Sequence, residues 1–164
     1  FGRLDVRTGR PILEPKTTDY QPGDHADLWE PLFPAHDYPM AAAEAGLALW
    51  RLTGKPIYRE ACRRWVGAIR ASLPARGGRG GYAEHYGRCI HFLLGCEPVI
   101  PEDDCRSLAR ELADDAVLRL FAGGMFRSHP GEDRCDAVDG VGYLALALLW
   151  LATGDDPPAM GFGW

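Results

Sequence analysis

The chain has 164 residues and a net charge of −5, with 46% hydrophobic and 25% charged residues. This length fits one domain with a core of its own, and the composition is typical of a soluble globular protein. The acidic balance gives no electrostatic basis for binding nucleic acid. The longest apolar run, at 141–152, has 12 residues and is too short to span a bilayer, so we expect no membrane partner.

The cysteines number five and form no CxxC pair, and this odd count with irregular spacing argues against a disulfide framework. We expect them to be small buried hydrophobic residues. They are Cys62, Cys89, Cys96, Cys105 and Cys135. The chain begins with Phe1 and carries no charged-then-apolar leader. We therefore expect a fragment of a longer protein, and the sequence does not indicate a compartment.

The N-terminal segment, residues 1–37, is rich in proline, aspartate and aromatic residues and shows no sustained period. It predicts irregular, turn-rich structure with at most a short strand around Pro11–Leu13. From Tyr38 onward the pattern changes to that of helices. We divide the single expected domain accordingly, into this segment and a helical array over 38–157.

The first predicted helix covers about 39–53. Asp37 can serve as its N-cap, Pro39 belongs in its first turn, and Gly54 ends it. The second helix, about 56–73, has an apolar stripe opposite an arginine-rich face. The same reasoning predicts three more helices, over about 82–95, 102–121 and 136–153. The fourth opens with Pro101 and three acidic residues, as the helix dipole favours.

Apolar character alternates along these five helices, because the first, third and fifth are apolar on most sides and the second and fourth on one. The ends of the apolar helices repeat loosely, as LALWRLTGKP at 47–56, IHFLLGCEP at 90–98 and LALLWLATGDDP at 146–157. Each runs into a glycine turn with a proline beyond it. This pattern is typical of stacked helical hairpins, in which an inner helix is covered by an outer one.

The alternation, the TG turns and the segment DGVGYLALALLWLATGD at 139–155 resemble the (α/α) toroids of the six-hairpin glycosidase-like superfamily and the related polysaccharide lyases. The resemblance covers about 36–157 and rests on architectural motifs. It implies an all-α fold and an incomplete toroid, since a complete one has about twice as many helices. The last inner helix would then lack an outer partner, which further hairpins from missing sequence or a second copy could supply.

The inner helices of such an array run parallel, so their N-termini emerge on one rim. Long glycine-rich connections, at 74–81 and 122–135, lead into that rim, whereas the turns at the other end are short. Long loops on one face of a scaffold are typical of a functional face. Polar residues also gather there. As catalytic candidates we select Glu84, His85, Tyr86, Asp37 and Asp139, and as substrate-binding candidates Arg127, His36, Trp29, Tyr82 and Asp136.

These residue types suit sugar chemistry. Carboxylates or a histidine–tyrosine pair exchange protons, aromatic faces stack on sugar rings, and arginine pairs with uronate carboxylates. Successive helical residues diverge by roughly 100°, so at most two of Glu84, His85 and Tyr86 face one substrate. Asp37 and Asp136 are better explained as helix N-caps, and His91, amid apolar residues, as a hydrogen-bonded core histidine.

Three functions stay open. In a lyase acting on a uronate-containing glycan by β-elimination, His85 or Tyr86 would remove the proton while Arg127 neutralises the carboxylate. In a glycoside hydrolase, carboxylates such as Asp37, Glu84 and Asp139 would supply acid and base. In a non-catalytic scaffold the rim residues would be only caps and solvated loops. We expect no cofactor and no metal, because the aspartates at 133, 136 and 139 lack a calcium-loop pattern.

Overall fold

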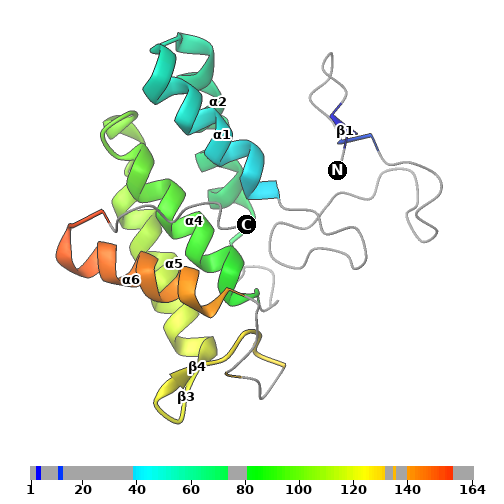
Figure 1. Ribbon diagram of the computed structural model, residues 1–164, viewed down its shortest axis with the longest axis vertical. Helices are drawn as coiled ribbons and strands as arrows, with labels where there is room; N and C mark the ends of the chain where they lie inside the picture. The colour runs from blue at the N-terminus through cyan, green and yellow to red at the C-terminus, as the bar shows by residue number, and fades with distance from the viewer. Residues whose placement is uncertain are drawn as a thin grey trace.

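The computed structural model describes residues 3–4, 11–12, 39–73, 81–131, 135 and 140–156. Within them the fold is all-α, as predicted, with two small hairpins of paired strands (Figure 1). The elements are β1 (Arg3–Leu4), β2 (Pro11–Ile12), α1 (Pro39–Thr53), α2 (Pro56–Ala71), α4 (Ala83–Cys96), the 3-10 helix η1 (Pro101–Asp103), α5 (Cys105–Leu120), β3 (Phe121–Ala122), β4 (Met125–Phe126) and α6 (Val141–Thr153). Both strand pairs are antiparallel, and β2 falls on the predicted strand.

The inner helices form a row with α4 in the middle, between α1 and α6 (Figure 1). Helices α1 and α4 run parallel, because Glu44 contacts Arg88 near their beginnings and Arg51 contacts Gly95 near their ends. Gly95 lets the two helices pack closely here, since a Cβ on it would lie 2.8 Å from the Leu47 side chain, which would have to shift. Two of the three inner helices are thereby locked in register.

Helices α4 and α6 also run parallel. Gly87 of α4 packs on the backbone of Tyr143, and further toward the C-terminal ends of both helices the His91 ring meets the Trp150 ring at 4.9 Å between centroids. The N-terminal ends of these inner helices therefore lie at one end of the array, as the hairpin pattern predicts. None of the described helices is long and apolar enough to cross a membrane.

The outer helices cover the row from behind, α2 against α1 and α5 against α4. Helix α2 is also tied to the connection between α4 and α5. Arg59 donates to the Val99 carbonyl at 3.0 Å, and Arg59 and Arg63 both bind Glu102. Arg63 binds Asp103 as well, at 3.2 Å. The arginine-rich face of α2, predicted to be a solvated face, is thus partly an intramolecular ion-pair network.

Helix α4 runs through the core, since 12 of its 14 residues are buried. Helices α1 and α6 were predicted to be buried on most sides, and this is wrong for both in the described structure. On α1 the buried positions are Met40, Ala43, Gly46 and Leu47, while Leu49 and Leu52 are exposed. Helix α6 is exposed on one face in the same way. Its buried positions are Leu144, Ala147 and Trp150, while Leu146 and Leu149 lie exposed on the opposite face. Among the described residues, nothing covers that face in the way that α5 covers α4.

The cysteines are free thiols, as predicted, and four of them are buried. Burial raises the pKa of Cys89 well above its ordinary value and that of Cys105 to about 11. Both thiols are therefore protonated at neutral pH and behave as small apolar groups.

Two details of the connections differ from the sequence prediction. The fourth helix was expected to begin near 102, but Pro101–Asp103 forms the 3-10 helix, and Asp104 with φ +48° separates it from α5. The acidic residues at 102–103 bind arginines of α2 and do not open the α-helix. Part of the loop predicted at 122–135 is the β3–β4 hairpin, whose turn holds Gly123 and Gly124 at positive φ.

Candidate functional site

The N-terminal ends of α4 and α6 approach each other so closely that glycine is required on both sides. A Cβ on Gly87 would lie 2.5 Å from the backbone nitrogen of Leu144 and 2.5 Å from the carbonyl carbon of Tyr143. A Cβ on Gly140 would lie 2.4 Å from the Glu84 Cβ, and Gly140 has φ +74°. This contact fixes Glu84 against the beginning of α6, at the rim that the sequence predicts as the functional face.

Arg88 joins three helices at this rim. Its Nε and Nη2 donate to the two carboxylate oxygens of Glu44 at 2.9 and 2.6 Å, and its Nη1 donates to Glu84 at 3.1 Å. The guanidinium carbon lies 6.0 Å from the centre of the Tyr143 ring on α6. We name Glu44, Glu84, Arg88 and Tyr143 the rim cluster. Two carboxylates from different helices thus meet on one cation.

The rim cluster is partly accessible to solvent. The side chains of Arg88, Glu44 and Glu84 are 11%, 17% and 19% exposed. Burial alone would favour loss of the Arg88 charge, but the hydrogen bonds to Glu44 and then to Glu84 outweigh it and raise the pKa of Arg88. The guanidinium therefore stays charged, and the two carboxylates remain within reach of a molecule arriving from solvent.

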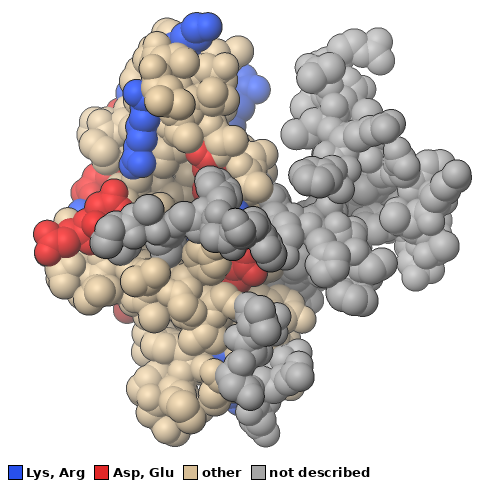
Figure 2. All heavy atoms as spheres, in the orientation of Figure 1, with Lys and Arg blue, Asp and Glu red and all other residues tan. Residues whose placement is uncertain are grey.

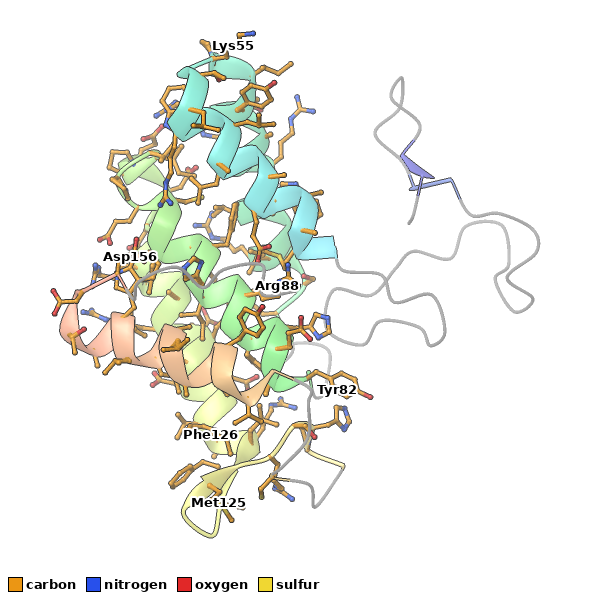
Figure 3. The ribbon with its side chains drawn as sticks, in the orientation of Figure 1. Lys55, Tyr82, Arg88, Met125, Phe126 and Asp156 are labelled. Atoms are coloured by element: carbon orange, nitrogen blue, oxygen red, sulfur yellow. The ribbon has the colours of Figure 1, made fainter. Side chains whose placement is uncertain are left out.

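Aromatic and imidazole rings stand at the start of α4. The Tyr82 ring lies 4.7 Å from the His129 ring and 6.1 Å from the His85 ring, centre to centre. The backbone of Ala83 donates to the carbonyl of Ser128 at 2.7 Å, which holds the segment after β4 against the beginning of α4. Figure 3 shows Tyr82 and Arg88 on the same side of α4, near its N-terminal end. The described rim therefore combines a charged cluster with a group of rings.

Tyr86 lies elsewhere. It is fully buried between α4 and α5, where its hydroxyl donates to Asp115 Oδ2 at 2.5 Å. Arg119 Nε binds the other oxygen of Asp115 at 2.7 Å. Burial, and then the hydrogen bond to Asp115, raise the pKa of Tyr86 far above its ordinary value. This tyrosine thus joins the α4–α5 hairpin and keeps its proton.

The sequence candidates fall into four groups. The structure brings Tyr82, Glu84 and His85 to the first turn of α4, although His85 is only 4% exposed. Tyr86 is separated from them by the helix. Arg127 lies beside the end of α5, where its backbone donates to Leu120 at 2.8 Å and its Nη2 to the Arg119 carbonyl at 3.4 Å. Asp37, Asp139, His36, Trp29 and Asp136 lie outside the described residues.

Glu44 and Arg88 were not selected from the sequence, yet a signal was present. Arg88 is the one charged residue inside GRCIHFLLG, a largely apolar stretch of a helix predicted to be apolar on most sides. A buried arginine requires carboxylate partners. Glu84, four residues earlier, is one of them, and the search for a second would have pointed to Glu44, the acidic residue within the first inner helix.

Among the described residues, no group of three histidine, cysteine, aspartate or glutamate side chains is placed to hold a metal ion. The site available for chemistry in the described structure is thus built from carboxylates, a guanidinium and rings. No family model matches the chain, and neither a curated protein nor a solved structure is detectably similar to it.

Proposed function

We propose that the chain belongs to a carbohydrate-active enzyme built as an (α/α) toroid, and that its glycan substrate binds at the rim formed by the N-terminal ends of the inner helices. The stacked hairpins and the parallel inner row support the architectural half of this proposal. The rim cluster, with the rings of Tyr82 and His129 at the same end of α4, supports the functional half.

One observation carries the choice of chemistry: Glu44 and Glu84 share the guanidinium of Arg88 while both remain partly exposed. Hydrolysis of a glycosidic bond needs two carboxyl groups, one as acid and one as base or nucleophile, on either side of the scissile bond. A substrate that enters the rim would compete for Arg88. The carboxylate released from the guanidinium could then take up a proton from solvent and act as the acid, while the carboxylate still paired with Arg88 stays ionised as base or nucleophile. Tyr82 and His129 offer ring faces on which a sugar can stack.

Glycoside hydrolysis is favoured over β-elimination by the position of Tyr86. A lyase needs a base that reaches the proton next to the uronate carboxylate. Tyr86 is buried against Asp115, and its raised pKa opposes loss of its proton. An elimination would therefore depend on His85, which packs beside Tyr82. We keep the lyase as the second candidate for this reason.

The experiment that tests the proposal is a screen of the purified chain against neutral and uronate-containing polysaccharides, read in two ways. Reducing ends report cleavage by either mechanism, whereas ultraviolet absorbance reports only the unsaturated product of elimination. We expect reducing ends to accumulate without absorbance. Absorbance that grows with the reducing ends would establish the lyase instead, and no product on any glycan would leave the non-catalytic scaffold as the function.

A further inference from the structure

The first and last inner helices end in the same structure. Thr53 Oγ1 donates to the Leu49 carbonyl at 2.6 Å, and Thr153 Oγ1 donates to the Leu149 carbonyl at 3.0 Å. In each helix the following glycine has positive φ, and its nitrogen donates to a tryptophan carbonyl at 2.8 Å. These two helices, α1 and α6, stand at opposite edges of the inner row (Figure 1). They are therefore structural repeats of each other.

Each of these helices exposes an apolar stripe, and the two stripes have the same spacing of three, four and three residues. On α1 the stripe is Ala42, Ala45, Leu49 and Leu52, and on α6 it is Gly142, Ala145, Leu149 and Ala152. Leu52 is 82% exposed and Leu149 is 55% exposed. Positions with this spacing lie on one helix face. Two matching apolar faces are thus left open at the two edges of the same row.

The charges that follow the stripes are opposite. Lys55 comes three residues after the last position of the α1 stripe, and Asp155 comes three residues after that of the α6 stripe. Asp156 adds a second exposed carboxylate there, while Arg51 adds an exposed cation at the end of α1. Figure 2 shows Lys and Arg atoms at the free end of α1 and Asp and Glu atoms at the end of α6, and Figure 3 labels Lys55 and Asp156.

We propose that the α6 stripe is an interface for a second copy of this chain, which docks with its α1 stripe in parallel orientation. The equal spacing lets Leu149 of one copy lie over Leu49 and Leu52 of the next. The same register brings Asp155 beside Lys55, so that the apolar contact and the charges agree. The partner is a second copy because the chain itself carries the complementary surface. That surface is the apolar stripe of α1 together with its basic end.

This contact is heterologous, since one copy uses α6 and the other α1. It continues the parallel row of inner helices, and so keeps the rim clusters of both copies at the same end. A pairing of α6 with α6 would cover one stripe but leave the α1 stripe and Lys55 open. The inference stands on the two edges alone and does not depend on the chemistry proposed for the rim.

The test is the association state of the purified chain by sedimentation equilibrium, with three leucine variants. We expect the wild-type chain to self-associate, and Leu149→Glu and Leu52→Glu each to raise the dissociation constant ~10-fold or more, as central apolar contacts do. Leu118→Glu is the matched control, because Leu118 is 82% exposed on α5, away from both stripes. This variant should change the dissociation constant less than about twofold. All three sites are exposed, and circular dichroism checks the fold.

Charge reversal tests the orientation. Asp155→Lys and Lys55→Glu should each weaken association by about two- to fivefold, the range of an exposed ion pair, and the two together in one chain should restore it. A chain that stays monomeric at about 100 µM overturns the proposal. Loss of association in Leu149→Glu but not in Leu52→Glu would instead show α6 pairing with α6, and would equally overturn it. None of these outcomes depends on activity toward glycans.

Discussion

Arg88 holds Glu44 through two parallel hydrogen bonds, Nε to Oε1 at 2.9 Å and Nη2 to Oε2 at 2.6 Å. This fork joins α4 to α1 at the point where both inner helices begin. The same guanidinium binds Glu84 on its own helix at 3.1 Å. A bidentate pair fixes distance and orientation together, so the two carboxylates are placed by one side chain.

Replacement of Arg88 by methionine should destabilise the protein strongly. The change keeps an aliphatic side chain but leaves two largely buried carboxylates without their cation, at a cost of about 2–4 kcal/mol. Urea unfolding measures this loss. Arg64→Met is the control, because the Arg64 side chain is 79% exposed and pairs with Glu60 on the same helix. Its cost should stay within about 0.5 kcal/mol, and equal losses in the two variants would contradict a joining role for Arg88.

Alanine at Gly87 should disrupt the packing of α4 on α6. Its Cβ would meet backbone atoms of Tyr143 and Leu144 at 2.5 Å, and backbone cannot move aside as a flexible side chain can. We expect a loss of about 2–3 kcal/mol in the free energy of unfolding. Gly142→Ala is the control, since none of the described residues would lie within 4 Å of its Cβ, and alanine there should stabilise α6 by up to about 1 kcal/mol. A neutral Gly87→Ala would show that the two helices are less closely packed.

Replacing Tyr86 with phenylalanine should lower the free energy of unfolding but leave the catalytic rate unchanged. The hydroxyl that is removed satisfies Asp115 in the α4–α5 interface, and its loss costs about 1–3 kcal/mol. The rate per folded molecule should stay the same, because Tyr86 does not reach the rim. Thermal unfolding and activity assays at matched folded fraction separate the two effects. A stable but inactive variant would return Tyr86 to the reaction and favour the lyase.

His91 should make the stability depend on pH below about 6.5. Burial between α4 and α6 is the largest cause that lowers its pKa, with Arg51 acting in the same direction and Asp156 and Glu44 opposing it. Because the native pKa is below the ordinary value of 6.5, the unfolded chain binds more protons in the window between the two values. The free energy of unfolding should therefore fall as the pH decreases from 6.5.

Urea unfolding at a series of pH values follows this effect. His91→Gln removes the titrating group and should flatten that part of the profile. An unchanged slope in His91→Gln would assign the acid sensitivity to other groups.

The helices and their ends were predictable because they depend on local chemistry. Pro39 and Gly54 bound α1 as predicted. The alternation of apolar patterns did not predict burial, because α5, predicted as an outer helix, buries seven residues and α6, predicted as an inner one, buries three. A helix dipole was invoked for the acids at 102–103, but long-range pairing with Arg63 and Arg59 decides their position. Such pairs join residues about forty positions apart, and the sequence does not specify which charge meets which.

The candidate site was predictable in place but not in composition. Its location follows from chain direction, because the inner helices all begin at one end. Which residues belong to the site depends on how α4 is rotated about its own axis. In the structure Tyr86 faces Asp115, whereas Glu84 faces Arg88. The exposed face of α6 was missed for a related reason, since an apolar composition on all sides does not say how many neighbours are present to cover it.

The most direct test of a catalytic rim is the rate of reducing-end release by three glutamate variants on the best glycan of the screen. Glu84→Gln and Glu44→Gln should each slow the reaction at least ~100-fold, the usual contribution of a positioned acid or base. Glu102→Gln, in the ion pairs with α2, should keep the rate within about twofold at matched folded fraction. Wild-type rates in Glu84→Gln and Glu44→Gln would contradict the assignment of the rim carboxylates to catalysis.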